Sequence, residues 1–584
     1  MASTTALLSG LAGLDVNSRR LEVIGNNISN VNTTAFKANS MVFSSAFSRT
    51  LSLGSGPTSG SGGTNPAQIG LGVRTAGTQR SFANGAPNAT GVNTHLAIDG
   101  DGFFIVERNG EQFFTRSGAF QLNNQNELVS PGGDRVQGYV VDDQFNILGG
   151  TLEELSIPLG SLTVAEATRN VQFSGNLNAD GDLATQGSLL QLGPYIDTAT
   201  TLDATGATLM TNLQGTGLAV DDVITISGAE RGQKTVRDAS FTVTATSTLQ
   251  DFGNFLMDAL GVVPGGGNDP TDPLPGPEPG SASVGTTTAG VLDLVGNWGE
   301  LNDLDLEASD FTLVDSAGAA KSNPFVPTKV SEATGESVRT TFVTYDSLGT
   351  ELRIDLTMVL SGRDGTGTQW RSFLQSADDT DSVTHLESGD RGGVFTAFAP
   401  LVQFDTEGQL LSPSQVNVEL DRFNTGAQDP LQFALTFDGA GDSVSALSDS
   451  GGNSTLSSIF QDGSPIGTLS SFSVGDDGII VGGFTNGLTR QIGQVALAKF
   501  TNPEGLVDQG NSLYSVGPNS GTALVTEPLE FGTGRVVGGA LEESNVDLSQ
   551  EFTDMILTQT GYTAATRVID TTNQLLQQLL ATGR

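Results

Sequence analysis

The sequence predicts a mainly β protein of several domains with an α-helix at each end. Its 584 residues are several times the usual size of one domain, so the chain should divide into several separate cores. Its 76 glycines and its short apolar runs favour strands and turns in the interior. Apolar residues recur every seven positions only near the two ends, which indicates terminal amphipathic helices.

The N-terminal helix is predicted from about residue 3 to residue 30. Its apolar stripe consists of Leu7, Leu14, Leu21 and Ile28 at sevenfold spacing, with Leu11, Ile24 and Val31 beside them. Ser18 and Gly25 interrupt this stripe, so the helix should need a partner surface to persist.

The C-terminal helix is predicted from about residue 548 to residue 581. Its stripe consists of Leu548, Met555, Tyr562, Ile569 and Leu576 at sevenfold spacing, widened by Phe552. Asp547 with Gln550 three positions later is typical of a helix start. Each terminal helix could dock on its own globular core. Their positions at the two ends favour instead a coiled-coil pair that leaves an apolar seam for neighbouring subunits.

The interior has the alternation and turn residues of β-structure. Residues 102–106 lead through Asn109-Gly110 into residues 112–115, which predicts a two-residue hairpin. Further strands are expected at 356–360, 479–481 and 494–500.

Changes in composition predict the boundaries. Residues 52–66 form a Gly/Ser-rich loop, and residues 264–280 contain six prolines and five glycines, which is typical of a linker or long surface loop. Between about 189 and 327 the sequence becomes rich in Thr, Ala, Gly and Asp, so this part is interpreted as an inserted domain.

The charge and the missing residue types argue against several functions. With 65 acidic and 26 basic residues, the formal charge of −39 repels nucleic acid. No apolar run approaches the roughly 18 residues that a membrane span needs, and no cleavable signal peptide is recognisable, so we expect no membrane insertion. Cysteine is absent, which excludes disulfides and thiolate chemistry.

No catalytic, cofactor or metal site is predicted. The two histidines, His95 and His385, lie in polar, turn-rich contexts. Residues 99–102 and 178–182 carry oxygen ligands at short spacing, but neither continues into a calcium loop, and both are interpreted as turns. An extracellular hydrolase that uses only carboxylates, as glycosidases do, stays open on composition alone.

Two long motifs carry a family resemblance. Residues 25–37 resemble the N-terminal signature of the flagellar rod and hook proteins, and residues 541–556 resemble their C-terminal signature. The motif residues are Asn26, Asn27, Asn30, Asn32, Thr33, Phe36, Ser544, Asn545, Val546, Asp547 and Leu548. The asparagine-rich run is interpreted as the end of the first helix, with an extended exit at Thr33 and Thr34. Thr560 stands where the family usually has arginine.

The interior is similar to the hook members of that family. The similar segments are 100–139, 345–349 and 486–506. Rod members are shorter and lack the outer domain. Residues 189–327 fall outside the resemblance, although 209–226 and 248–252 are faintly similar to a short β-α insert of flagellins and hook-associated proteins. A distal-rod or hook-associated protein is the alternative within this class, and a secreted acidic adhesin or surface-layer protein is the alternative outside it.

The resemblance implies nested domains. These are a terminal helical polymerisation domain (1–32 and 545–584), a connecting segment (33–88 and 521–544), an inner β domain (89–175 and 465–520) and an outer β region (176–464) that contains the insert. It implies a non-enzymatic subunit that polymerises with itself into a flexible extracellular tube, the universal joint that passes torque from rod to filament. It also implies export by the flagellar apparatus without a cleaved signal, and contacts with the distal rod, hook cap and hook–filament junction proteins.

Overall fold

The chain forms two compact units, each built from its own stretches of sequence. The computed structural model describes residues 2–263, 280–380, 386–389, 400–439, 443–448 and 452–582. The first unit contains residues 1–163 and 468–584, and the second contains residues 164–467. The chain therefore leaves the first unit and later returns to it. His385 and nearly all of the predicted linker at 264–280 lie outside the described residues.

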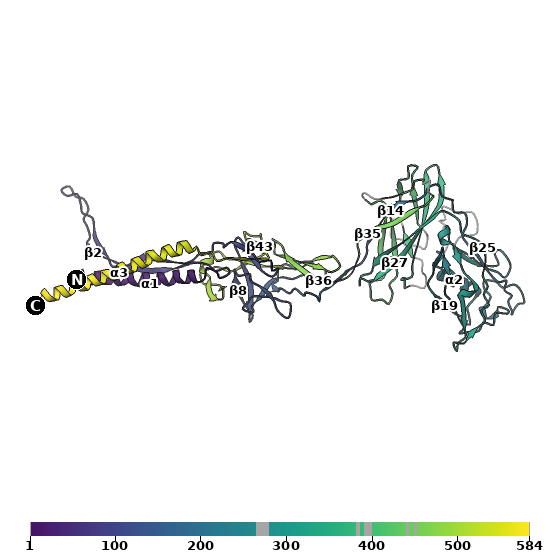
Figure 1. The fold of residues 1–584 in the computed structure, drawn as a ribbon, viewed down its shortest axis with the longest axis horizontal. Coiled ribbons are helices and arrows are strands. Elements are labelled where there is room, and N and C mark those ends of the chain that lie inside the picture. The colour runs from purple at the N-terminus through teal and green to yellow at the C-terminus, as the bar shows by residue number, and fades with distance from the viewer. Residues whose placement is uncertain are drawn as a thin grey trace. The chain divides into compact units, whose positions relative to one another are not determined.

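Two long helices begin and end the first unit. Helix α1 covers Ala2–Ser29 and helix α3 covers Leu548–Thr582, close to the predicted ranges. They lie side by side with the chain ends at the same end of the pair (Figure 1). Asp547 Oδ1 accepts the backbone N–H groups of Ser549 and Gln550 at 2.8 and 3.2 Å, which confirms the predicted helix start. Within the described ranges, no helix is long and apolar enough to cross a membrane.

A large, mostly antiparallel sheet forms the body of the first unit. Its strands from this unit are β7 (Phe103–Arg108), β8 (Glu111–Thr115), β9 (Gln121–Leu122), β10 (Leu128–Val129), β11 (Arg135–Tyr139), β12 (Glu153–Glu154), β37 (Ile479–Phe484), β38 (Thr489–Val495), β39 (Leu497–Lys499), β40 (Val507–Gly510), β41 (Leu513–Ser515) and β42 (Leu524–Thr526). Asn109 and Gly110 both have positive φ between β7 and β8, which confirms the predicted hairpin. Phe103, Phe114 and Phe500 are among its core residues.

Strands from the two halves of the first unit pair with each other near the helices. Strand β5 (Pro87–Ala89) pairs with β44 (Ala540–Glu542), and β6 (Leu96–Asp99) pairs with β43 (Arg535–Gly538). Strands β1 (Asn39–Ser45) and β4 (Val73–Arg80) form a separate pair that contacts α1. Strands β2 (Ser48–Ser52) and β3 (Ala67–Gly70) form a hairpin whose tip is the Gly/Ser-rich segment 53–66.

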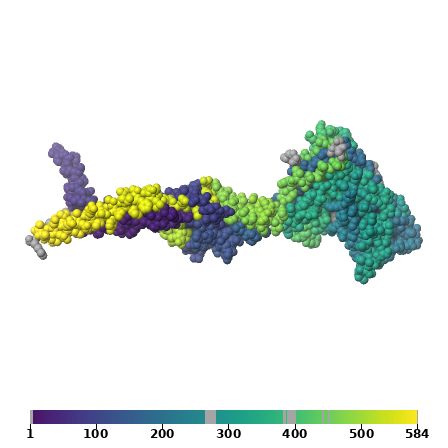
Figure 2. All heavy atoms as spheres, in the orientation of Figure 1, coloured from purple at the N-terminus to yellow at the C-terminus, as the bar shows by residue number. Residues whose placement is uncertain are grey.

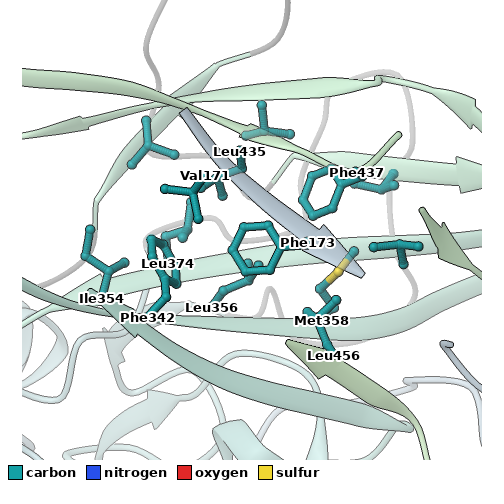
Figure 3. Packing of buried hydrophobic residues seen from close by; sticks show 14 of the residues in the cluster. Val171, Phe173, Phe342, Ile354, Leu356, Met358, Leu374, Leu435, Phe437 and Leu456 are labelled. Carbon is teal, nitrogen blue, oxygen red and sulfur yellow. The ribbon is translucent and has the colours of Figure 1, made fainter. Parts of the chain in front are cut away.

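The second unit contains a β-sandwich. One sheet has β26 (Ser337–Tyr345), β27 (Glu351–Asp364), β28 (Gly367–Ser376), β30 (Leu401–Phe404) and β31 (Leu410–Ser412). The other has β14 (Asn170–Asn176), β29 (Glu387–Gly389), β32 (Gln415–Leu420), β33 (Leu431–Thr436), β34 (Val444–Ser445) and β35 (Thr455–Gln461). Their inner faces meet in an apolar core, where Phe173 packs edge-on against Phe342 with 5.2 Å between ring centroids (Figure 3).

A second apolar core in this unit is formed almost wholly by residues 190–325. Its strands include β15 (Leu189–Leu192), β16 (Val223–Ile226), β19 (Ala239–Thr242), β20 (Ser281–Val284), β21 (Leu292–Val295) and β23 (Phe311–Val314), and β25 (Thr328–Ser331) pairs with β15. Helix α2 (Leu249–Ala259) packs Phe252 and Leu256 into it. Thr248 and Asp251 cap the start of α2 reciprocally. The stretch taken as an insert thus contains its own core, with the β-α element suggested by the faint similarity.

One local prediction was wrong. Thr33 and Thr34 lie in turns, and the first strand begins only at Asn39. The reason is the next residue, Ala35, which has φ 55° and donates its backbone N–H to the carbonyl of Glu542 at 2.8 Å. A contact with the far end of the chain therefore sets the turn.

Candidate assembly surface

Small residues form the contact between α1 and α3. A Cβ atom placed on Gly10 would lie 3.0 Å from Ile569 Cγ1, and one on Gly561 would lie 3.1 Å from Asn17 Oδ1. Gly13 faces Ala565 in the same way. The order of these contacts shows that the helices run antiparallel. Without side chains at the glycines, the two backbones approach closely and leave little room for leucine between them.

Polar contacts continue this seam toward the start of α3. Arg20 Nη2 donates to Asp554 Oδ1 at 2.9 Å, and Asn27 Nδ2 donates to Glu551 Oε1 at 2.8 Å. Partial burial raises the pKa of Glu551, although the hydrogen bond from Asn27 acts in the opposite direction. The seam is therefore held by specific hydrogen bonds as well as by close packing.

The predicted stripe of α1 is only partly covered within one chain. Ile24 is buried, as is Val16, which the sevenfold spacing did not single out. Leu7, Leu14, Leu21, Ile28 and Val31 are half-buried, and Leu11 is exposed. Val16 lies eight positions before Ile24, on the same face of a 3.6-residue helix, so a helical period could have identified it.

The predicted stripe of α3 is covered even less. Met555, Ile569 and Leu576 are half-buried, whereas Leu548, Phe552 and Tyr562 are exposed. Ile556 and Leu557 are 64% and 62% exposed, and Val568, Leu575 and Leu580 are exposed as well. The buried positions include Thr558 and Thr572. In Figure 2 the α3 surface (yellow) lies along α1 (purple) with much of its length uncovered. Most of the large apolar side chains described in α3 thus face solvent in a single chain.

The two family motifs fold against each other, since Asn545 N donates to the carbonyl of Phe36 at 3.3 Å. Asn27 Nδ2 donates to the carbonyl of Asn39 at 2.8 Å, and Asn39 N donates back to Asn27 Oδ1 at 3.0 Å. From the other end of the chain, Asn545 Nδ2 donates to the carbonyls of Ser81 and Ala83 at 2.9 and 3.0 Å. The side-chain amides of Asn27 and Asn545 therefore take the place of backbone hydrogen-bond partners. They do so where the segments after α1, after β4 and before α3 meet.

The remaining motif residues have local roles. Asn30 Nδ2 donates to the carbonyl of Asn26 at 2.9 Å, and Thr33 Oγ1 donates to Asn30 Oδ1 at 3.1 Å. Ser544 Oγ accepts from Val546 N at 3.4 Å, and Val546 is buried. Asn32 and Leu548 are exposed, and Phe36 is half-buried.

A buried ionic cluster lies beside these motifs and was not predicted. Lys37 Nζ donates to Glu542 Oε1 at 2.6 Å and to the carbonyl of Ala83 at 2.8 Å. Arg116 Nη1 lies 3.9 Å from Glu542 Oε2. Burial lowers the pKa of Lys37, and the charge of Glu542 opposes this shift. Lys37 and Glu542 belong to the two signature segments, which was the only signal in the sequence.

Exposed apolar side chains also occur on the β2–β3 hairpin. Phe47, immediately before β2, is 82% exposed, and Leu51, Leu53 and Ile69 are exposed too. Their positions in a hairpin rich in serine and glycine gave no periodic signal, so the sequence did not indicate them.

Two candidates weighed from the sequence, His95 and the acidic segment 99–102, have local structural contacts. His95 is half-buried, and its Nδ1 lies 2.9 Å from Thr90 Oγ1 in a turn. The segment 99–102 is a turn as predicted, with positive φ at Gly100 and Gly102. Asp99 there pairs with Arg535. Within the described part of the chain, no group of three or more acidic or histidine side chains is placed to hold a metal ion.

Four family models match the chain in order along its length. They are the flagella basal body rod protein (residues 7–37), the flagellar hook protein FlgE/F/G D1 domain (97–179), the flagellar basal body protein FlaE D2 domain (313–464) and the flagellar basal body rod FlgEFG protein C-terminal (537–582). Together they span just over half of the sequence.

Relatives named flagellar hook protein FlgE align over almost the whole chain. The protein of Treponema pallidum is 27% identical over 99% of each chain. The protein of Borreliella burgdorferi is 28% identical over 98% of each chain, and that of Escherichia coli K12 is 23% identical over 98% of this chain and 99% of that one. The crystal structure of Helicobacter pylori FlgE2 covers 78% of this chain and 100% of that one, at a TM-score of 0.36 and 18% identity.

The family models match both ends and the interior, and they follow the order that the two signatures predicted. The relatives have nearly the same extent as this chain. The hook-like D1 and D2 segments lie in different units of the structure, apart from the last residues of the D1 match. This chain therefore belongs to the flagellar rod and hook protein family.

Proposed function

We propose that this flagellar hook subunit polymerises through the large apolar side chains of α1 and α3 that its own fold leaves exposed. We call them the uncovered helix residues: Leu8, Leu11, Phe552, Ile556, Leu557, Leu575 and Leu580. The observation that carries the proposal is the contrast between this set and the seam between the two helices. Small residues fill the seam, whereas these large apolar residues remain in solvent, as is typical of an interaction surface.

The energetics suit a polymer. Complete burial of one such side chain contributes about 1.5–3 kcal/mol. A surface that meets a different surface of the next copy repeats at every added subunit and produces a helical assembly. Two half-buried stripe residues adjoin this surface. Ile569 borders the seam at Gly10, and Leu21 belongs to the stripe of α1.

We propose that the domains are nested, each outer one inserted into the chain of the one before it. Residues 1–32 and 545–584 form the polymerisation domain, 33–88 and 521–544 connect it, 89–175 and 465–520 form the inner β domain, and 176–464 form the outer region. The insert within the outer region runs from about 189 to 327. Support comes from the pairing of strands across the two chain ends and from the separate apolar cores.

The mechanical role follows from the two kinds of surface. Apolar helix contacts give strong cohesion between subunits, while polar, glycine-rich outer surfaces exchange contacts at little cost. Such a tube bends while it transmits torque. We further propose that the subunit leaves the cell without a cleaved signal through the flagellar export apparatus. Its other partners are proposed to be the distal rod, hook cap and hook–filament junction proteins.

Substitution of two uncovered helix residues tests the proposal. The double variant Ile556→Gln with Leu557→Gln should remain a folded monomer, with the circular dichroism of the wild type, but should fail to form sedimentable tubes. The matched control is Thr560→Gln with Thr563→Gln, which changes two exposed polar residues of the same helix and should polymerise normally. Tubes of normal length from the first variant would contradict the proposal.

Variants of two half-buried stripe residues provide a second test. Leu21→Asp and Ile569→Asp should each block polymerisation, because an unpaired carboxylate buried in an apolar contact costs several kcal/mol. Electron microscopy of cells that carry each variant should show no hooks, while the protein accumulates in the medium.

A further inference from the structure

The second unit contains a cavity of about 320 Å³ whose lining is strongly basic. Its cationic residues are Arg231, Lys234, Arg237, Arg339 and Arg353. The whole chain has only 26 basic residues against 65 acidic ones, so five of them around one cavity is a marked local reversal of charge. Only two carboxylates, those of Asp355 and Asp378, line the same cavity.

Two parts of the second unit form its walls. One wall is the turn region of β17 (Glu230–Arg231) and β18 (Lys234–Thr235), which belong to the stretch with its own core. The other is the sandwich sheet, where Arg339 lies on β26, Arg353 and Asp355 on β27, and Gln375 on β28. The pairing of these strands fixes the spacing of the charges on the sheet side.

Arg231 is a buried cation in the wall of this cavity. It is among the lining residues although it is only 2% exposed, and its Nη1 donates to the carbonyl of Gly261 at 2.6 Å. Its Nε and Nη2 have no hydrogen-bond partner among the described residues. A buried guanidinium with unused donors is costly unless an acceptor meets it. Burial, and next the charge of Arg339, lower the pKa of Arg231, which shows that its surroundings disfavour the cation.

Both carboxylates of the cavity are already engaged. Asp355 pairs with Lys234 and accepts from Thr341 Oγ1 at 2.6 Å. Asp378 accepts from the backbone N–H of Arg353 at 2.8 Å. Arg353 pairs with the exposed Glu351 at 3.3 Å. Arg237 and Arg339 donate to backbone carbonyls. A carbonyl does not neutralise a charge, so the lining still carries a net positive charge.

We propose that this cavity binds a small oxyanion of the phosphate or sulfate class. Arginine guanidinium groups are suited to such ligands because their planar donors match the oxygen atoms. The only apolar residues of the lining are Val236 and Ala377, so it has no aromatic surface on which a nucleotide base could stack. A bound anion would join the β17–β18 turn to the sandwich sheet. This proposal is independent of how the helices assemble.

Titration with inorganic phosphate tests the proposal on the full-length monomeric chain. Calorimetry at constant ionic strength, with chloride as the replaced anion, should show saturable binding of one phosphate per chain, and sulfate should compete. The unfolding temperature of the second unit should rise with phosphate concentration, because a ligand of the folded state stabilises it. Absence of saturable binding would overturn the proposal. The acceptor for the basic lining would then be a carboxylate of a neighbouring copy.

Three variants make the assignment specific. Arg231→Met should weaken phosphate binding at least tenfold, without lowering the unfolding temperature measured in the absence of phosphate. Arg353→Met, at an exposed position of the lining, should weaken binding several-fold and fold normally. Arg169→Met, on an exposed surface of the same unit, is the control and should bind as the wild type does. If all three variants bound phosphate equally well, the assignment of the site would be wrong. If Arg231→Met does not fold, the result for Arg353→Met alone decides.

Discussion

The ammonium nitrogen of Lys37 lies 2.6 Å from Oε1 of Glu542, although 505 positions separate the two residues along the chain. Both side chains are almost completely buried. The same carboxylate oxygen accepts the backbone N–H of Gly85 at 2.8 Å, and Arg116 approaches its other oxygen. One buried carboxylate thus connects the segment after α1, the inner β region and the segment before α3.

Removal of the ammonium group should destabilise the first unit. Lys37→Met keeps the apolar stem but leaves Glu542 without its closest cation. Breaking a buried pair costs about 3–5 kcal/mol, and we expect the lower end because Arg116 still faces the carboxylate. Denaturant unfolding measures the loss. Arg19→Met, which breaks the exposed pair with Asp15, is the control and should cost less than about 1 kcal/mol. Equal effects of the two substitutions would show that the buried pair has no special role.

The close approach of α1 and α3 should depend on Gly10. A valine there would place Cβ 3.0 Å from Ile569 Cγ1 and its methyl groups closer still, so we expect a loss of about 1–3 kcal/mol from overpacking. The matched control is Gly25→Val, because a Cβ on Gly25 meets no atom within 4 Å. That variant should be neutral or slightly stabilising, since valine has a better helix propensity than glycine. Thermal unfolding of the monomer, followed by helical circular dichroism, distinguishes them. The same effect from both substitutions would show that the helices are not paired in the monomer.

The stability of the second unit should decrease at alkaline pH through Tyr195. Burial raises the pKa of this phenol above its ordinary value of 10.0. Above pH 10 the unfolded chain therefore loses the proton while the folded chain keeps it, so the unfolded state binds fewer protons and the free energy of unfolding falls as pH rises.

Tyr195→Phe removes this titration. The variant should lose less stability than the wild type between about pH 9.5 and 11 in chemical denaturation. Tyr562→Phe makes the same change in the first unit and should leave the slope of the second unit unchanged. An unchanged slope in Tyr195→Phe would show that other groups account for the alkaline decrease.

Deletion of residues 189–327 should leave the first unit and polymerisation intact, because the paired helices and their motifs lie outside this stretch. The deletion should nevertheless destabilise the rest of the second unit. Trp298 and Val263 pack against Val359 and Phe373 of the sandwich sheet, which would become exposed. The loss of burial should cost about 1.5–3 kcal/mol for each of the two side chains, Val359 and Phe373, that remain. Unfolding transitions of the two units report both effects, and a variant that cannot polymerise would place the insert within the assembly surface.

The features that depend on neighbouring residues could be predicted from the sequence. The sevenfold spacing from Leu7 to Ile28 and from Leu548 to Leu576 indicated both helices almost to their ends, because helical periodicity is a local property. Asn109-Gly110 likewise specified its hairpin, since a turn of that type requires two residues that tolerate positive φ. The two signatures indicated the family for the same reason, as continuous runs of residues.

Which surfaces meet could be learned only from the folded chain. The seam runs along Gly10 and Ile569 rather than along the leucines, because the distance between two helices depends on the smallest residues at their crossing. The buried pair of Lys37 and Glu542 and the cavity at Arg231 join residues that are far apart in the chain. No spacing rule relates such residues, since burial and charge balance arise from packing of the whole unit.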